Sequence, residues 1–510
     1  MRRIAISLML IAFAISSFAQ SKNDFVNVKK YGAKADGLVD DTYAIQKALN
    51  DAPNKGGICF LPSGRYRLNG SLIVPEGVTL KGSYDGVPHP LHPIGTVLLI
   101  YGGKGNADAA PAITLKFNAS IKNLLIHYPE QQAPPKVISY PWTIRINGDL
   151  CQIVDMAMTN PYMAIDAGTN ASGLHFISNV YACPLKIGIY VDQCYDIGRI
   201  ENVHFNPNLW KYTGFEQTLP VPPADYEGGK DKFWNDLLIP YLNENLIGFK
   251  IGRTDWEYIS NSFVIFAKQG FLFDDFGFGE GNALVTQSGS DIGPVAVQVN
   301  KVQKASGVQF TNCQFMSTVK IGPENTGPVK ISNSGFWIIK DTYEQIVQEG
   351  TGTLILNACH FSDWDIPNAG TPCIRASNGR LIVSNCEFVR PWTGDIYLKK
   401  QAILFEEKFI AGTVTGSLFH NDTISNISDG KVELMANIIE DATSDIDLTK
   451  AKLIDICKMY EFKITDVLTI LKSQGVKAEP DMSIEDIAEE NKISAVDVFN
   501  ILSSHLKDMK

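Results

Sequence analysis

The chain has 510 residues, of which 45% are hydrophobic and 20% charged, so we expect a globular protein with a large buried core rather than a disordered one. The formal net charge of -10 is spread along the sequence without a basic run that could neutralise phosphates, which argues against nucleic acid as a partner. No segment beyond the N-terminus reaches the roughly 18 apolar residues of a membrane span.

The first twenty residues have the layout of a secretory signal. Arg2 and Arg3 precede an apolar run, and Ser17 and Ala19 form a small-x-small exit. The apolar run is too short to cross a bilayer. We therefore expect residues 1–20 to be removed, and the mature protein to be secreted or held in the periplasm or at the cell surface.

Three acids, Asp36, Asp40 and Asp41, lie close together before a short amphipathic segment. We interpret them as turn and helix-capping residues rather than as an active site, because a carboxylate at a helix N-terminus accepts backbone hydrogen bonds and favours the helix dipole. The apolar residues of the following segment share one helical face, and they are Ala44, Ile45, Ala48 and Leu49. This helix is expected to cap the open end of a repeat structure.

A short strand template recurs through most of the remaining chain. The clearest copies are VQFTNCQF (308–315), VKISNSGF (329–336), LILNACHF (354–361) and LIVSNCEF (381–388). Strand-rich repeats of this length, with no helical pattern between the copies, predict a parallel β-solenoid whose coils stack at ~4.8 Å. The solenoid is expected to occupy residues 21–440.

One position of the template forms a column of mostly Asn residues. Its members are Asn123, Asp155, Asn179, Asn202, Asn261, Gln287, Asn312, Asn333, Ala358 and Asn385. Stacked Asn side chains can hydrogen-bond along such a column. A neighbouring inward column holds Cys313, Cys359 and Cys386, which we expect to be buried free thiols.

The cysteine content does not indicate a disulfide framework. Nine cysteines is an odd number over a large chain, although Cys183 and Cys194 could pair. The sequence has no CxxC or HExxH motif, so no metal site is predicted.

Residues 25–85 resemble the opening of a pectate-lyase superfamily domain. The resemblance rests on VNVKKYGAKADGLVDDTYAIQKALN, followed by GGICFLPSGRYRL and VPEGVTLKGS. It implies an all-β fold, the right-handed parallel β-helix of rhamnogalacturonase-like and epimerase-like proteins and of relatives of the family 28 and family 55 glycoside hydrolases, here with about ten coils and an N-terminal capping helix. It also implies contact with carbohydrate, but not one reaction, because the family includes hydrolases, lyases and phage tailspikes.

Acids follow a second set of strands. YMAID (162–166), GIYVD (188–192), GFKIG (248–252) and GFLFD (270–274) can be aligned, and three of them end in Asp. On successive coils Asp166 and Asp192 would lie one strand spacing apart, and Asp192 and Asp274 two spacings, or ~9.6 Å. An inverting glycosidase needs roughly 6.5–9.5 Å between its carboxyl groups and a retaining one about 5–5.5 Å. We predict Asp166, Asp192 and Asp274 as catalytic, with capping of the next turn as the alternative.

The next candidates come from a motif comparison and from a neighbouring strand. Family 28 polygalacturonases carry an Asp-Asp motif that Asp274 and Asp275 could supply, but their Gly-His-Gly and Arg-x-Lys motifs have no counterpart in place here.

In GRTDWEYISN (252–261), alternation would put Asp255 and Glu257 on one side of the strand with Arg253, as a site or as a surface ion pair. Asp255 is therefore a further catalytic candidate. The substrate-binding candidates of this stretch are Arg253, Trp256 and Glu257.

Residues 206–245 form an insertion that is rich in aromatic residues. Long insertions often overhang functional sites, and sugar rings stack on aromatic side chains. The predicted substrate-binding residues are Trp210, Tyr212 and Trp234, with His204 as an acid–base helper. The alternative is that the aromatic residues only pack the insertion onto the coils.

Residues 445–510 show a helical pattern with an internal repeat. LIDICKMYEFKITDVLTIL (453–471) matches IEDIAEENKISAVDVFNIL (484–502). Apolar residues at helical spacing predict a small all-α domain without a catalytic signal. Docking to a protein partner is one role that such a domain could have.

These observations predict an exported polysaccharide-degrading enzyme, in the first place a glycoside hydrolase with paired Asp residues and no cofactor. A polysaccharide (uronate) lyase is the second reading, with Asp192, Asp274 and Arg253 as base and neutralising groups and calcium as a cofactor. A non-catalytic glycan-binding or adhesive solenoid is the third. The expected partner is a polysaccharide or oligosaccharide in every case.

Overall fold

The computed structural model describes residues 25–85, 94–337, 344–366, 369–390, 399–440, 449–459 and 462–506. The predicted signal, residues 1–20, lies outside the described residues. The chain divides into two compact units, Met1–Tyr258 and Ile259–Lys510. This division falls inside the predicted β-helix domain, and the predicted domain boundaries stay a prediction.

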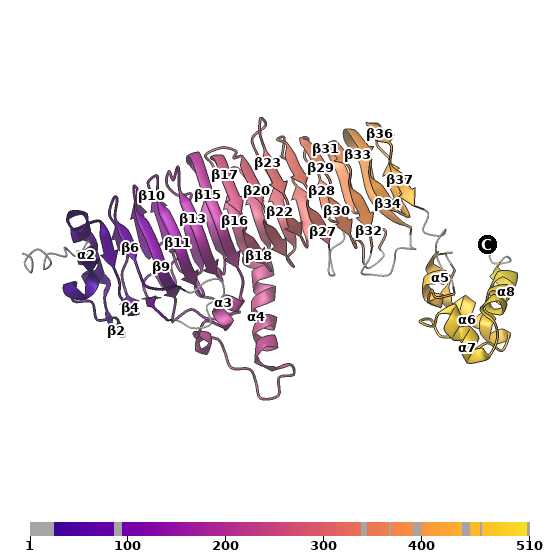
Figure 1. The fold of residues 1–510 in the computed structure, drawn as a ribbon, viewed down its shortest axis with the longest axis horizontal. Coiled ribbons are helices and arrows are strands. Elements are labelled where there is room, and N and C mark those ends of the chain that lie inside the picture. Colours follow the sequence, from indigo (N-terminus) through magenta and orange to yellow (C-terminus); the bar gives the residue numbers. More distant parts are fainter. Residues whose placement is uncertain are drawn as a thin grey trace, which may run out of the picture. The chain divides into compact units, whose positions relative to one another are not determined.

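The first unit is built from short parallel strands that stack side by side (Figure 1). Its first series consists of β5 (Leu72–Val74), β8 (Ile113–Lys116), β10 (Trp142–Asn147), β12 (Met163–Ala167), β14 (Ile187–Val191) and β16 (Ile247–Ile251). Longer strands alternate with these along the chain, and they are β9 (Ser120–His127), β11 (Gln152–Met158), β13 (Phe176–Ala182) and β15 (Cys194–Phe205). The remaining strands of this part are β1 (Val26–Asn27), β2 (Asp36–Asp40), β3 (Ile58–Phe60), β4 (Gly64–Leu68), β6 (Thr79–Lys81), β7 (Thr96–Ile100) and β17 (Thr254–Ser260). Each coil therefore adds one strand to each series, which confirms the predicted right-handed parallel β-helix.

The longer strands bend at the predicted column. Asn123, Asp155, Asn179 and Asn202 have φ values of 58°, 56°, 53° and 52°, the left-handed region that Asn and Asp tolerate best. Asn179 Nδ2 donates to Asp155 Oδ1, and Asn202 Nδ2 donates to Asn179 Oδ1, both at 2.8 Å. The column thus divides each longer strand into two halves. The first halves form a second series, which β3 and β6 join, and the second halves form a third series, which β4 and β7 join. The side chains of the column hydrogen-bond along the stack as predicted.

The second unit repeats this plan with its own three series of parallel strands. One series consists of β19 (Gln269–Phe273), β22 (Val295–Val299), β25 (Thr318–Ile321), β28 (Ile346–Gln348), the first parts of β31 (Ile374–Ser384) and β33 (Lys400–Thr415), and β35 (Asp422–Asn426). Another consists of β20 (Ala283–Thr286), β23 (Val308–Thr311), β26 (Val329–Ser332), β29 (Thr353–Asn357), the last parts of β31 and β33, and β36 (Lys431–Met435). The third consists of β18 (Phe263–Ile265), β21 (Gly289–Asp291), β24 (Gln314–Phe315), β27 (Gly335–Trp337), β30 (His360–Ser362), β32 (Glu387–Val389), β34 (Leu418–His420) and β37 (Ile438–Glu440).

The interior of the second unit is ordered in columns. Cys313, Cys359 and Cys386 are buried, as predicted, each directly after a left-handed residue of the column. The rings of Phe361 and Phe388 stack at 4.7 Å and 9°. All nine cysteines of the chain are buried and free, so the suggested pairing of Cys183 with Cys194 is wrong.

The three acids near the N-terminus have the structural role that the sequence predicts. Asp36 Oδ1 accepts the backbone N–H groups of Leu38 and Val39, and Asp41 accepts those of Lys34 and Ala35. Asp40 Oδ1 accepts the N–H of Thr42, the first residue of α2 (Thr42–Asp51), which follows η1 (Val28–Tyr31) and precedes η2 (Ala52–Asn54). The helix buries Ile45, Ala48 and Leu49, while Gln46 bonds both backbone groups of Ile73 in β5.

The insertion between β15 and β16 packs on the outside of the first unit. It contains α3 (Asn208–Lys211), η3 (Glu216–Thr218) and α4 (Gly229–Asn245). Phe215 is buried in a cluster with apolar side chains that project outward from the third series, among them Val97, Leu125 and Ala157. The insertion therefore covers part of that surface.

The C-terminal segment is helical, as its periodicity predicts. Its helices are α5 (Leu453–Met459), α6 (Ile464–Ser473), α7 (Ile484–Asn491) and α8 (Ala495–Leu506). Their shared core contains Leu453, Leu471, Ile484, Ile487 and Val498. Among the described residues, no helix has both the length and the apolar character that crossing a membrane requires.

Candidate functional site

A row of polar and aromatic side chains runs along the outside of the first series in the first unit. Strand register places Arg145, Asp166, Tyr190 and Lys250 opposite one another on β10, β12, β14 and β16. The residues that precede them are buried without any exposure, and they are Ile144, Ile165, Ile189 and Phe249. Because side chains alternate along a strand, the row of four points away from the core.

The row presents cations beside aromatic rings. Arg145 Nε lies 2.5 Å from Asp166 Oδ2, and the Arg145 side chain keeps 24% of its surface exposed. Lys250 Nζ lies 4.3 Å from the centre of the Tyr190 ring. The Trp142 ring, from the start of β10, stacks on Tyr190 at 6.3 Å and 19°. This surface is able to bind an anionic ligand that also has apolar faces.

Asp166 and Asp192 are not the stacked pair that the sequence alignment predicts. The buried isoleucines set the register, so Asp166 pairs with Tyr190 whereas Asp192 lies one residue beyond β14. Both side chains are fully buried. The predicted stacking is therefore wrong, because YMAID and GIYVD align two residues out of the register that Ile165 and Ile189 impose.

The bonds of these two acids are those of turn-capping residues. Asp166 Oδ1 accepts the N–H groups of Gly168 and Thr169 at 3.0 and 2.8 Å. Asp192 Oδ1 accepts the N–H of Arg253 at 2.6 Å, and its Oδ2 accepts the Tyr190 hydroxyl at 2.9 Å. Their oxygens are thus engaged within the protein, and the turn-capping alternative fits them.

Asp274 and Asp275 lie in the second unit, after β19. Asp274 Oδ1 accepts the Asp275 N–H and its Oδ2 accepts Asn300 Nδ2, both at 2.8 Å. Asp275 is exposed, and the N–H groups of Gly277 and Gly279 that it accepts lower its pKa. Both acids order the turn after the strand, and their catalytic role, including a pairing of Asp274 with Asp192, stays a prediction.

The stretch around β17 departs from simple alternation. Asp255 is exposed, whereas Thr254 and Glu257 are both buried, so the prediction that Asp255 and Glu257 share one side is wrong. Arg253 lies 5.6 Å from the exposed Tyr195 ring, and Trp256 is half-buried. Arg253, Asp255 and Trp256 retain exposed surface, but Glu257 has none with which to contact a glycan.

The aromatic residues of the insertion divide between packing and exposure. Trp210 and Trp234 are buried, and their Nε1 atoms donate to Thr218 Oγ1 and to the Pro220 carbonyl. Tyr212 is 42% exposed and donates to Asp231. His204 is half-buried, with its ring 6.0 Å from Tyr181. The packing alternative therefore describes the two tryptophans, which are closed to a glycan in this structure.

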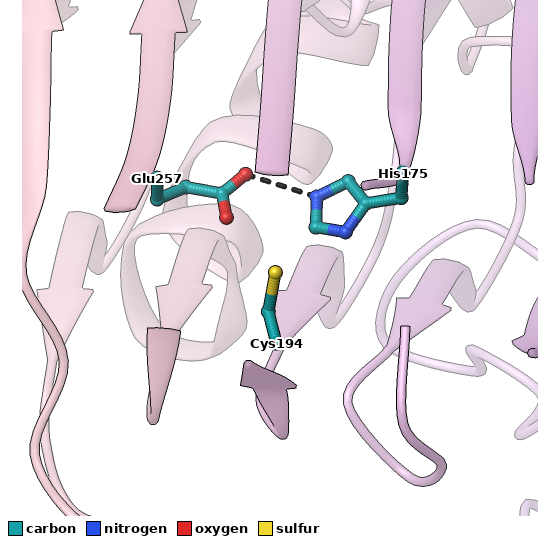
Figure 2. A group of neighbouring side chains, drawn as sticks. All are labelled: His175, Cys194 and Glu257. Atoms are coloured by element: carbon teal, nitrogen blue, oxygen red, sulfur yellow. Dashed lines mark hydrogen bonds and ion pairs between the residues drawn. The ribbon is translucent and has the colours of Figure 1, made fainter. Parts of the chain in front are cut away.

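A buried cluster that the sequence interpretation missed lies beneath this region (Figure 2). His175, just before β13, faces Glu257 of β17, and the Cys194 sulfur, at the start of β15, points toward the space between them. His175 Nε2 lies 3.0 Å from Glu257 Oε1. Burial alone would lower the pKa of His175, but the Glu257 carboxylate and the Cys194 side chain raise it well above its ordinary value. The only sequence signal was their place at coil edges, because 82 residues separate His175 from Glu257.

The stacked series and their left-handed bends define a parallel β-helix protein. The family described as rhamnogalacturonase A/epimerase, pectate lyase-like, matches residues 25–218. The chain therefore carries a pectate lyase-like β-helix domain, which confirms the resemblance seen in residues 25–85.

Curated relatives match only short segments. Alginate lyase 7 from Azotobacter vinelandii is 47% identical over 66 residues, which is 11% of this chain and 8% of that protein. Mannuronan C5-epimerase AlgE4 from the same organism is 40% identical over 65 residues, 11% of this chain and 12% of that protein. Non-secreted LysM effector LysM19 from Penicillium expansum is 46% identical over 57 residues, 11% and 4% of the two chains. The chain thus spans a small part of the length of these relatives.

Solved structures match more of the chain at low identity. The match to an N-terminal fragment of bacteriophage Phi29 gene product 12 covers 86% of this chain and 75% of the fragment, with 14% identity and a TM-score of 0.45. The match to DFA-IIIase from Arthrobacter chlorophenolicus A6 without its lid covers 82% of this chain and 99% of that structure, with 13% identity and a TM-score of 0.42.

Proposed function

We propose that the protein is an exported carbohydrate-active enzyme that acts on an anionic, uronate-containing polysaccharide along the outward surface of β10, β12, β14 and β16. The observation that carries this proposal is the row of Arg145, Asp166, Tyr190 and Lys250 with Trp142 beside it. The relatives named alginate lyase and mannuronan C5-epimerase support the same substrate class.

The chemistry of the row suits a chain of uronate residues. Guanidinium and ammonium groups bind carboxylates, and Arg145 and Lys250 supply one of each. Aromatic rings stack on the apolar C–H faces of sugars, and the partly exposed Tyr190 ring lies beside Lys250, while the Trp142 ring, which is 8% exposed, stacks on Tyr190. Because the groups repeat at the strand spacing along the coils, the surface is suited to an extended ligand.

The reaction that this row favours is proton removal next to the uronate carboxyl group, as in elimination or epimerisation. Such a step needs a cation at the carboxylate and a proton donor and acceptor nearby. Burial, followed by the carboxylates of Asp192 and Asp166, raises the pKa of Tyr190, so its hydroxyl keeps a proton, which it donates to Asp192 Oδ2. In the proposed step the Tyr190 hydroxyl takes up the proton that leaves the uronate and passes its own proton to the Asp192 carboxylate, which is the acceptor. Hydrolysis by Asp192 and Asp274 is the alternative reaction, and the engagement of Asp192 with Tyr190 and Arg253 N–H argues against it.

The test is a panel of purified polysaccharides offered to the protein. We expect activity on polyuronates, detected as unsaturated uronates for elimination or as changed uronate stereochemistry by NMR for epimerisation. Lys250→Ala should lower kcat/KM at least about tenfold, the effect of losing ~1.4 kcal/mol of binding to one charge. The exposed Lys81→Ala serves as the matched control and should leave kcat/KM unchanged.

Three outcomes would contradict the proposal. New reducing ends without unsaturated products or changed stereochemistry would mean hydrolysis. Retention on a polyuronate column without turnover would mean a binding protein. Equal activity of Lys250→Ala and the unchanged protein would remove the row from the site.

A further inference from the structure

We propose that His175, Cys194 and Glu257 bind one divalent transition-metal ion, with zinc as the best match, and that this ion ties three consecutive coils of the first unit together (Figure 2). The three residues come from the coils of β13, β15 and β17. The inference is independent of the proposed polysaccharide activity.

The donor atoms already lie close to the spacing that a metal ion needs. One nitrogen, one sulfur and one carboxylate oxygen all lie within 4.8 Å of one another, and the three side chains are fully buried. Zinc bonds of about 2.0–2.3 Å place tetrahedral ligands roughly 3.3–3.8 Å apart. Small rotations of side chains would close the difference. Imidazole, thiolate and carboxylate are also the ligand types that zinc accepts together.

The surroundings orient the histidine for such a bond. His175 Nδ1 lies 2.7 Å from the Ser172 carbonyl oxygen, to which it can only donate. With the Nδ1 proton held there, Nε2 is the ring atom that faces Cys194 and Glu257. A backbone carbonyl behind the second ring nitrogen is the usual support of a metal-binding histidine.

The coil between His175 and Glu257 provides the space. Register pairs Phe176 with Arg199, so His175 lies next to Gly198 on the neighbouring strand. A Cβ atom at Gly198 would lie 2.2 Å from Glu257 Oε2 and 2.5 Å from His175 Cε1. Glycine therefore lets side chains from two non-adjacent coils meet across the coil that supplies Cys194.

A buried His–Glu ion pair explains two of the three residues, and the Cys194 thiol donates to the Asp196 carbonyl oxygen at 2.8 Å. Such a pair would be complete without sulfur, whereas Cys194 Sγ reaches the same space. Metal binding would release two protons, one from the Cys194 thiol and one from His175 Nε2, and would leave a thiolate, a neutral imidazole and a carboxylate around the ion. The thiolate is the group that separates the two explanations.

The test uses the full chain purified from a zinc-supplemented culture. We expect about one zinc ion per chain by elemental analysis. After removal of the metal by a chelator, added Co²⁺ should produce a sulfur-to-cobalt charge-transfer band in the near ultraviolet. Cys194→Ser should lose this band, whereas Cys183→Ser, a buried thiol outside the cluster, should keep it. Folded protein that binds neither zinc nor Co²⁺, or a Cys194→Ser variant with an unchanged band, would overturn the proposal.

A second measurement covers the case in which Cys194→Ser does not fold. The unchanged protein should melt at a lower temperature in a chelator and recover its melting temperature when zinc is restored. Glu257→Gln keeps the size of the side chain and should weaken zinc binding at least tenfold in a competition with a chromophoric chelator. A melting temperature that is insensitive to both chelator and zinc would also overturn the proposal.

Discussion

Acid should loosen the first unit through His127, the last residue of β9. This side chain is 1% exposed, its Nδ1 lies 2.7 Å from Thr159 Oγ1, and its ring stacks on Phe215 of the insertion at 4.0 Å and 15°. Burial, with a further contribution from Arg65, lowers the pKa of His127 to about 3, although Asn160 opposes the shift. The folded protein therefore holds the neutral ring.

The sign and the size of the effect follow from this shift. The unfolded chain binds the proton with a pKa near 6.5, so the stabilisation is complete above about pH 6.5 and is lost as the pH falls toward 3. At about pH 5 the unfolding free energy contributed by His127 has fallen by roughly 2 kcal/mol, because pH 5 lies about 1.5 pH units below 6.5 and each unit corresponds to ~1.36 kcal/mol.

This loss of unfolding free energy can be measured by urea unfolding with tryptophan fluorescence as the signal. Trp210 and Trp234 report on it because they lie in the insertion that Phe215 anchors. Between about pH 7.5 and pH 5 the protein should lose roughly 2 kcal/mol more unfolding free energy than His127→Gln, which shares every other titrating group. Equal losses in the two proteins would refute the reasoning, because the neutral ring would then contribute nothing.

Five substitutions test the packing of the coils, each by urea unfolding. Ala358→Asn should raise the unfolding free energy by about 1 kcal/mol, because Ala358 holds φ 51° where Asn is better tolerated, and Asn333→Ala should do the reverse. Gly198→Ala should cost about 1–3 kcal/mol by overpacking against Glu257, whereas the methyl of Gly173→Ala meets no atom closer than 3.3 Å and should cost less. Phe388→Ala, which empties a place between two stacked rings, should cost about 3–5 kcal/mol. A reversed sign for Ala358→Asn, or equal costs for the two glycines, would contradict these accounts.

The fold was predictable because its repeated feature is local. An Asn in a left-handed bend between two short apolar strands leaves the same residue pattern in the coils from Asn123 to Asn385, and even Gln287 and Ala358 occupy that bend. The helical pattern of the C-terminal segment is equally local, because apolar residues recur at helical spacing within each copy of its repeat. Leu453 and Ile484, at equivalent positions of the two copies, share one core.

The candidate site was less predictable because it depends on register and on long-range contacts. Aligning the Asp residues of YMAID and GIYVD ignored the inward isoleucines, which shift the pairing so that Asp166 meets Tyr190. His175 and Glu257 are separated by the insertion, whose course no local pattern defines, so their contact required the assembled coils.

The left-handed bend also decides where this molecule can change. In β9, β11, β13 and β15 the second series turns into the third through a single residue such as Asn179 or Asn202, which leaves no room for extra sequence. The first coils use longer connections, residues 61–63 between β3 and β4 and residues 82–95 between β6 and β7. The return to the first series is free in length: it uses residues 183–186 after β13 but residues 206–246 after β15. Loops exchanged in this connection from the third series to the first would change the outer surface one loop at a time. The backbone hydrogen bonds between the strands underneath would keep their spacing.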